Sequence, residues 1–279
     1  MGPLVSAKWL FDRLHDSGTV ILDATLPAVG VTPPVDTRAR FQAQHIPGVV
    51  FFDIEELSDH ATSLPHMMPS PEAFSRAMSE LGIGDGMTIV VYEQEGVYSA
   101  PRARWMLRTF GAREVYLLDG DLRAWREAGL PVETGFSSRI PASFHAKVDQ
   151  TAVQDFAQLQ QRIAERAQIL DARSEGRFSG ALPEPRPGLS SGHMPGAINV
   201  PYTALVEEGR LKSAAKLRTL FDEKGVDTKL PITTTCGSGV TAAVVSLGLE
   251  IVGAPQVKLY DGSWAEYAQH PKAVIEREP

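Results

Sequence analysis

Cysteine is almost absent from this chain, because its 279 residues include only Cys236. One cysteine cannot form an intrachain disulfide, and it cannot build a zinc or iron–sulfur site that needs several thiolate ligands. The roles that remain for Cys236 are burial as a small apolar side chain and reactivity as a thiol.

Long apolar runs, targeting signals and an excess of positive charge are also missing. No uninterrupted apolar stretch approaches the about 18 residues of a membrane-spanning helix, and the start has no basic segment followed by an apolar core and a cleavage site. Acidic residues outnumber basic ones by 34 to 27, whereas a dedicated nucleic-acid-binding domain is usually basic. We therefore expect a soluble, cytoplasmic protein with no membrane or nucleic-acid partner.

Three short sequence blocks occur twice, in the same order, about half a chain apart. The pairs are Ile21–Ala24 with Ile169–Ala172, His45–Gly48 with His193–Gly196, and Asp119–Gly120 with Asp261–Gly262. A chain of this length corresponds to two domains of about 150 residues each. We predict one domain over residues 1–137, a linker over 138–152 and a second domain over 153–279 that carries the cysteine.

Each copy alternates short apolar strands with helices. The expected strands are Val20–Asp23, Val49–Phe52, Met87–Tyr92 and Val115–Leu118 in the first copy, and Gln168–Leu170, Ala197–Val200, Pro231–Thr235 and Val257–Tyr260 in the second. Helices are expected over 100–110 and 241–251. This alternation is typical of an α/β fold, so each domain should be a mostly parallel sheet flanked by helices.

Cys236 lies at a turn from a strand to a helix. It follows the β-branched run Ile232–Thr235 and precedes Gly237-Ser238-Gly239-Val240-Thr241, after which an apolar helix begins. Ligand sites of open α/β sheets lie at the carboxyl ends of strands. Two glycines let backbone N–H groups turn inward, and the helix N-terminus adds partial positive charge. Residues 237–241 are therefore expected to form a cradle for a thiolate or an anionic persulfide.

The alternative interpretation of this turn is a phosphate-binding loop. Cysteine phosphatases place an arginine after five intervening residues, and that position is Ala242 here. The lysine of a Walker loop and the glycine pattern of a dinucleotide-binding loop are also absent. The comparison favours a small, neutral cradle that fits one sulfur atom over a phosphatase.

The motifs CGSGVT and YDGSW, with the repeated Asp-Ala and His-x-Pro-Gly blocks, resemble the tandem-domain rhodanese family over essentially the whole chain. Its 3-mercaptopyruvate sulfurtransferases have the same neutral loop, whereas its thiosulfate sulfurtransferases usually carry two basic residues where this chain has Gly237 and Ser238. The resemblance implies a non-catalytic rhodanese-like domain over 1–137 and a catalytic one over 153–279.

The resemblance also implies an activity. Cys236 would take the sulfur of 3-mercaptopyruvate as a persulfide, release pyruvate, and pass the sulfur to thioredoxin, a small thiol or cyanide. Thiosulfate:cyanide sulfurtransfer is the alternative activity, and a non-catalytic sulfur carrier is a weaker one that the presence of Cys236 disfavours. Neither a metal nor an organic cofactor is expected.

Site residues follow from the same resemblance. Arg177, in Gly-Arg-Phe, and Arg186, in Pro-Glu-Pro-Arg, are expected to bind the substrate carboxylate, since guanidinium groups bind carboxylates in a two-pronged geometry. Tyr98 is expected near the substrate carbonyl. With Cys236, three further catalytic residues would form a relay: Ser238, His66 and Glu55. Relatives often have Asp at the last position, so the geometry of that relay stays open.

Overall fold

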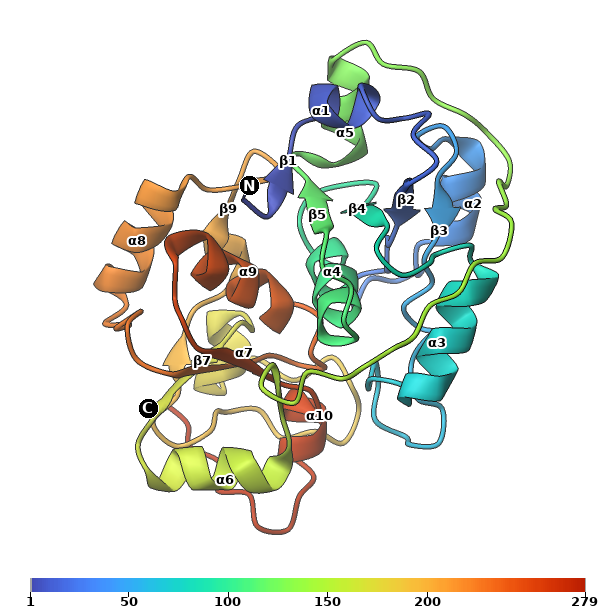
Figure 1. The fold of residues 1–279 in the computed structure, drawn as a ribbon. Helices are drawn as coiled ribbons and strands as arrows, with labels where there is room; N and C mark the ends of the chain where they lie inside the picture. The colour runs from blue at the N-terminus through green and yellow to red at the C-terminus, as the bar shows by residue number, and fades with distance from the viewer. Residues whose placement is uncertain (1, 279) are drawn as a thin grey trace. The chain divides into compact units, whose positions relative to one another are not determined.

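The computed structural model describes residues 2–278, which divide into two compact units. The first unit runs to His60 and continues over Met68–Asp149 and Glu208–Leu211. The second consists of Ala61–Met67, Gln150–Glu207 and the chain from Lys212 onwards. The segment that carries His66 therefore groups with the second unit, although it lies in the first half of the sequence. Each unit contains one five-stranded sheet with its own helices (Figure 1).

The sheet of the first unit is parallel throughout and has the strand order β1-β5-β4-β2-β3. Its strands are β1 (Leu4–Val5), β2 (Thr19–Asp23), β3 (Val50–Phe51), β4 (Thr88–Tyr92) and β5 (Val115–Leu118). All five residues of β2 are buried, as a strand covered by helices on both faces requires.

The sheet of the second unit repeats this plan with the order β6-β12-β11-β7-β8, again parallel throughout. Its strands are β6 (Val153–Gln154), β7 (Gln168–Asp171), β8 (Ile198–Asn199), β11 (Ile232–Thr235) and β12 (Val257–Tyr260). Two further short strands, β9 (Val206–Glu207) and β10 (Arg210–Leu211), lie outside the five-stranded sheets. The predicted fold class is confirmed, whereas the predicted domain and linker boundaries stay predictions.

Helices connect the strands in both units. The first unit has α1 (Ala7–Phe11), α2 (Thr37–Ala43), α3 (Pro71–Glu80), α4 (Ala100–Thr109) and α5 (Asp121–Glu127). The second has α6 (Phe156–Ala164), α7 (Glu175–Ser179), the 3₁₀ helix η1 (Tyr202–Leu205), α8 (Ala214–Glu223), α9 (Ala242–Val252) and α10 (Ser263–Tyr267). N-terminal capping residues begin several of these helices. The Ser70 hydroxyl accepts from the N–H of Ala73 at α3, and Asp155 and Gln158 form a capping box at α6. No helix within residues 2–278 has the length and apolar character to cross a membrane.

Matching tryptophans anchor the two cores. Trp125 follows β5 and Trp264 follows β12, and each side chain is fully buried. Each indole N–H donates to a backbone carbonyl, that of Pro131 at 2.6 Å and that of Ser190 at 2.8 Å. Burying a ring of this size while satisfying its polar atom stabilises the end of each sheet in the same way.

In the first unit, a carboxylate accepts hydrogen bonds from the backbone N–H groups of the strand-to-helix turn. Glu93 follows β4 as Cys236 follows β11, and its side chain is buried. The carboxylate accepts from the N–H groups of Tyr98 (2.7 Å), Ser99 (3.0 Å) and Ala100 (3.1 Å), and from the Ser99 hydroxyl (3.1 Å). These donors favour the ionised form, yet burial outweighs them and raises the pKa of Glu93 to about 7.

This buried carboxyl group makes the stability of the first unit depend on pH. A Glu whose pKa rises from 4.5 to about 7 on folding binds an extra proton in the native state between those values. Its stabilising contribution is present below about pH 4.5 and falls by about 3 kcal/mol as pH rises through 7. We expect Glu93→Gln to remove this component from the free energy of unfolding, measured by calorimetry from pH 4.5 to 8. Glu95→Gln, an exposed change in the same loop, should keep the wild-type pH dependence of the free energy of unfolding. A wild-type pH dependence in Glu93→Gln would contradict the role given to Glu93.

Candidate active site

Cys236 is held at the end of β11 by hydrogen bonds from the start of α10. Its residue is only 2% exposed. Its N–H donates to the Ser263 hydroxyl at 3.2 Å, and its carbonyl accepts from the N–H of Trp264 at 2.9 Å. The carbonyl of Gly237 accepts from the N–H of Ala265 at 2.9 Å. The backbone on both sides of the thiol is therefore fixed before any ligand binds.

The loop behind the thiol leaves several N–H groups uncommitted. Within the described part of the chain, the N–H groups of residues 237–241 have no acceptor. Gly239 has φ +77°, a conformation that side chains disfavour, and α9 begins directly after Thr241. The loop thus offers a curved row of donors and a helix N-terminus, an arrangement that stabilises an anion.

Ser238 lies between a histidine and an arginine. Its hydroxyl oxygen is 2.8 Å from Nδ1 of His66 and 3.2 Å from Nη2 of Arg186. A guanidinium group can only donate, so the hydroxyl accepts from Arg186, and it can donate its own proton to Nδ1 in the tautomer of His66 that carries its proton on Nε2. His66 is 3% exposed and has φ +60°, a strained conformation for a residue with a side chain. The predicted pair of Ser238 and His66 is therefore brought together.

Both predicted arginines lie beside Gly237. A methyl group built at Gly237 would come 2.9 Å from Nη2 of Arg177 and 3.5 Å from Nη1 of Arg186. Arg177 lies on α7, and its side chain is 23% exposed. Glycine at 237 gives these two cationic groups the room to approach the loop that carries the thiol.

A buried ion network holds Arg177 in place. The Glu184 carboxylate accepts from Nε of Arg177 at 3.2 Å and from its Nη2 at 2.5 Å, and it also accepts from Nη1 of Arg173 at 2.7 Å. Arg173 in turn donates to Asp171 at 2.5 Å and lies 4.0 Å from the ring centre of Trp264. Because the side chains of Arg173, Glu184 and Asp171 are at most 1% exposed, each charge needs its partner.

The two remaining predicted residues belong to the first unit. Glu55 follows β3 and is exposed, and its carbonyl accepts from the N–H of Ser58 at 3.1 Å. Tyr98 is half-buried, and its N–H donates to the Glu93 carboxylate at 2.7 Å. Their roles in a relay and beside a substrate carbonyl stay predictions.

Three residues that support the site were not singled out from the sequence: Ser263, Glu184 and Arg173. Ser263 is separated from Cys236 by 27 positions, so only the fold reveals that its hydroxyl receives the Cys236 N–H. One signal was present, because Ser263 and Asp121 both follow a repeated Asp-Gly pair. Both have φ near +50° to +60° and both accept from the loop after the neighbouring strand.

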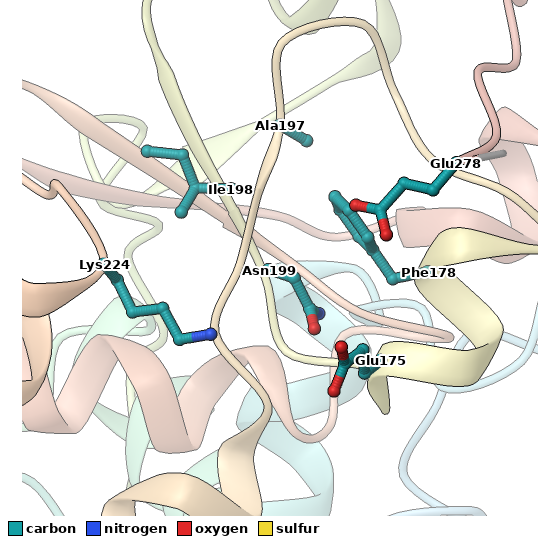
Figure 2. A pocket seen from close by; sticks show the side chains of 7 residues that line it. All are labelled: Glu175, Phe178, Ala197, Ile198, Asn199, Lys224 and Glu278. Atoms are coloured by element: carbon teal, nitrogen blue, oxygen red, sulfur yellow. The ribbon is translucent and has the colours of Figure 1, made fainter.

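The second unit also has a pocket that contains none of the predicted site residues. Its volume is about 350 Å³. Figure 2 shows its lining from α7, β8 and the ends of α8 and the chain: Glu175, Phe178, Ala197, Ile198, Asn199, Lys224 and Glu278. Within residues 2–278, no group of three or more His, Cys, Asp or Glu side chains could hold a metal ion.

Comparisons with known proteins agree over nearly the full chain. A model of the rhodanese-like domain matches residues 6–128 and 155–270. The chain is 44% identical to the 3-mercaptopyruvate sulfurtransferase of Escherichia coli (strain K12) over 273 residues, which cover 98% of this chain and 97% of that protein. It is 42% identical to the 3-mercaptopyruvate sulfurtransferase of Homo sapiens over 274 residues, with 95% and 91% covered. The crystal structure of SseA from Escherichia coli matches with a TM-score of 0.88 and 42% identity, covering 95% of this chain and 99% of that chain.

The hydrogen bond from Cys236 to Ser263 gives a prediction for stability. Ser263→Ala leaves the buried N–H of Cys236 and the carbonyl of Tyr260 without their hydroxyl partner. We expect the free energy of unfolding of the second unit to fall by about 1–3 kcal/mol, measured by denaturant titration. Ser190→Ala, an exposed change in the same unit, should alter it by less than about 0.5 kcal/mol. Equal effects of the two changes would contradict the role given to Ser263.

Proposed function

The chain belongs to the rhodanese family, and we propose that it is a sulfurtransferase that receives the sulfur of 3-mercaptopyruvate on Cys236. The observation that supports this most directly is the loop itself. A single cysteine lies at the start of a row of uncommitted N–H groups, beside two arginines and a paired serine and histidine. This arrangement supplies a nucleophile, a place for the sulfur anion it becomes, and a carboxylate site.

The transfer step is a nucleophilic displacement at sulfur. The Cys236 thiolate attacks the thiol sulfur of 3-mercaptopyruvate, so that an S–S bond forms and the C–S bond breaks. The electron pair of the C–S bond passes into the adjacent carbonyl and gives the enolate of pyruvate. The donor's thiol proton then protonates the enolate carbon, which leaves pyruvate and the persulfide anion of Cys236. Covalent catalysis of this kind has ping-pong kinetics.

Proton transfer is assigned to Ser238 and His66. The Ser238 hydroxyl accepts from Arg186 and lies 2.8 Å from Nδ1 of His66, so with His66 in the Nε2–H tautomer it can pass a proton between the donor and the imidazole. Glu55 is proposed as the carboxylate that orients His66. Tyr98 is proposed as the group that contacts the donor carbonyl while it takes up negative charge.

The carboxylate of the donor is assigned to Arg177 and Arg186. The Nε edge of Arg177 is used by Glu184, which leaves its Nη1 and the second proton of Nη2 for a ligand. Arg186 adds further donors beside Gly237. A neutral loop with one carboxylate site fits a donor that has a single negative charge better than it fits thiosulfate, which has two. Thiosulfate therefore remains the alternative donor.

The second half-reaction returns the enzyme to its starting state. A nucleophile attacks the outer sulfur of the persulfide, and Cys236 leaves as a thiolate. Thioredoxin, a small thiol or cyanide are the proposed acceptors, and this chemistry uses no metal or organic cofactor. The cytoplasmic location stays a prediction of the sequence.

Mass spectrometry tests the persulfide. After incubation with 3-mercaptopyruvate and no acceptor, the protein should gain the mass of one sulfur atom on the peptide that contains Cys236, with pyruvate released in equal amount. Cys236→Ser removes the nucleophile, so neither product should form beyond the uncatalysed rate. Pyruvate production at the wild-type rate by Cys236→Ser would rule out the proposed mechanism.

The donor is tested by steady-state kinetics. With cyanide as the common acceptor, we expect kcat/KM for 3-mercaptopyruvate to exceed that for thiosulfate by at least about tenfold. The second negative charge of thiosulfate has no cationic partner in the neutral loop, and a missing charge-assisted contact costs about 1.4 kcal/mol or more, which is a factor of ten. A kcat/KM for thiosulfate that equals or exceeds the value for 3-mercaptopyruvate would make thiosulfate the donor.

A further inference from the structure

One feature of the arginine pair is unusual for a site that binds anions, because a buried carboxylate is built into it. Glu184 uses both of its oxygens on guanidinium groups, at 2.7 Å from Nη1 of Arg173 and at 2.5 Å from Nη2 of Arg177. Its side chain is 1% exposed, so solvent screens these contacts weakly. The negative charge of Glu184 therefore contacts Arg177, which in turn lies beside Gly237 in the loop of Cys236.

The charges of this network nearly cancel. The four side chains of Arg173, Arg177, Asp171 and Glu184 have a formal charge of zero, and Arg186, which also lies beside Gly237, brings the formal charge of the five to +1. Arg173 makes three of its contacts with Asp171 and another with Glu184. Glu184 is then the group that offsets the charge of Arg177, the arginine closest to Gly237.

We propose that Glu184 determines donor specificity by lowering the positive charge that a donor meets at Arg177 and Arg186. The inference rests on the proposed function, in which these two arginines bind the donor. A site of charge +1 matches the single carboxylate of 3-mercaptopyruvate. Removing the charge of Glu184 would favour both anionic donors, but it would favour dianionic thiosulfate about twice as strongly in free energy, since Coulomb energy scales with the product of the charges.

Glu184 also selects the face that Arg177 shows to a donor. Because the carboxylate is bound to Nε and Nη2, the opposite edge of the guanidinium group is turned away from Glu184.

A glutamine keeps a hydrogen-bonding oxygen at this position but loses the charge. An aspartate keeps the charge but withdraws it by one methylene. The two variants therefore separate charge from position.

The test compares kcat/KM for thiosulfate with kcat/KM for 3-mercaptopyruvate in each variant. We expect Glu184→Gln to raise this ratio at least about tenfold, the size expected for one unit of charge acting over about 12 Å at an effective dielectric constant of about 20. Glu184→Asp should leave the ratio within about threefold of wild type even if both KM values rise. An unchanged ratio in Glu184→Gln, or an equal shift in Glu184→Asp, would overturn the proposal.

Glu175→Gln is the matched control. Glu175 lies on the same helix as Arg177, is exposed, and lines the separate pocket in Figure 2, so the change removes the same charge away from the arginines. Its ratio should equal that of wild type. If circular dichroism shows that Glu184→Gln is unfolded, Glu184→Ser makes the same charge change and leaves room for water beside both guanidinium groups.

The failure of this proposal is distinguishable from failure of the proposed function. Persulfide formation on Cys236 is measured for wild type with each donor before the variants are compared. If neither donor forms it, the proposed function is wrong. If wild type forms it from 3-mercaptopyruvate and the ratio does not change in Glu184→Gln or Glu184→Ser, only the role of Glu184 is wrong.

Discussion

The backbone N–H groups at the turn after the central strand are the constraint on which both units depend. A parallel sheet that feeds a helix through a tight loop leaves such donors without strand or helix partners. The first unit supplies the carboxylate of Glu93, which receives four hydrogen bonds. The second unit has Cys236 at that position, too short to reach across its loop. The same backbone turn is therefore closed by a carboxylate in one copy, and in the other it leaves its N–H groups for the sulfur anion of the proposed function.

The turns are fixed in matching ways although their contents differ. The N–H groups of Leu122 and Trp264 donate to the carbonyls of Glu93 and Cys236, respectively, in units that share one strand order. In each unit a residue with positive φ also receives an N–H from the loop. The rigidity of the loop thus belongs to the fold, and the chemistry depends on which side chain the fold presents there.

Much of this arrangement follows from the sequence, and the omissions have physical reasons. Four strands in each unit lie in apolar or β-branched runs between turn residues, which is why their pattern predicted them. The edge strands β1 and β6 have only two residues each and lie in no longer apolar run, whereas the equally short β3 and β8 fall within the runs Val49–Phe52 and Ala197–Val200. The contact of Ser238 with His66 joins positions 172 residues apart, and it was expected only through the family resemblance. In the sequence, Glu184 cannot be told from an exposed charged residue of a proline-rich loop, because only the fold buries it between Arg173 and Arg177.

The neutral loop and the arginines depend on each other. A side chain at Gly237 would meet Arg177, which cannot simply move aside because Glu184 binds it through two nitrogens. A basic residue there would add steric overlap and like-charge repulsion next to two guanidinium groups. In this chain, a basic residue at position 237 would therefore require these arginines to rearrange. Under the proposed function, donor preference would then depend on the loop, Arg177 and Glu184 together, and replacing the loop residues alone would not transfer it.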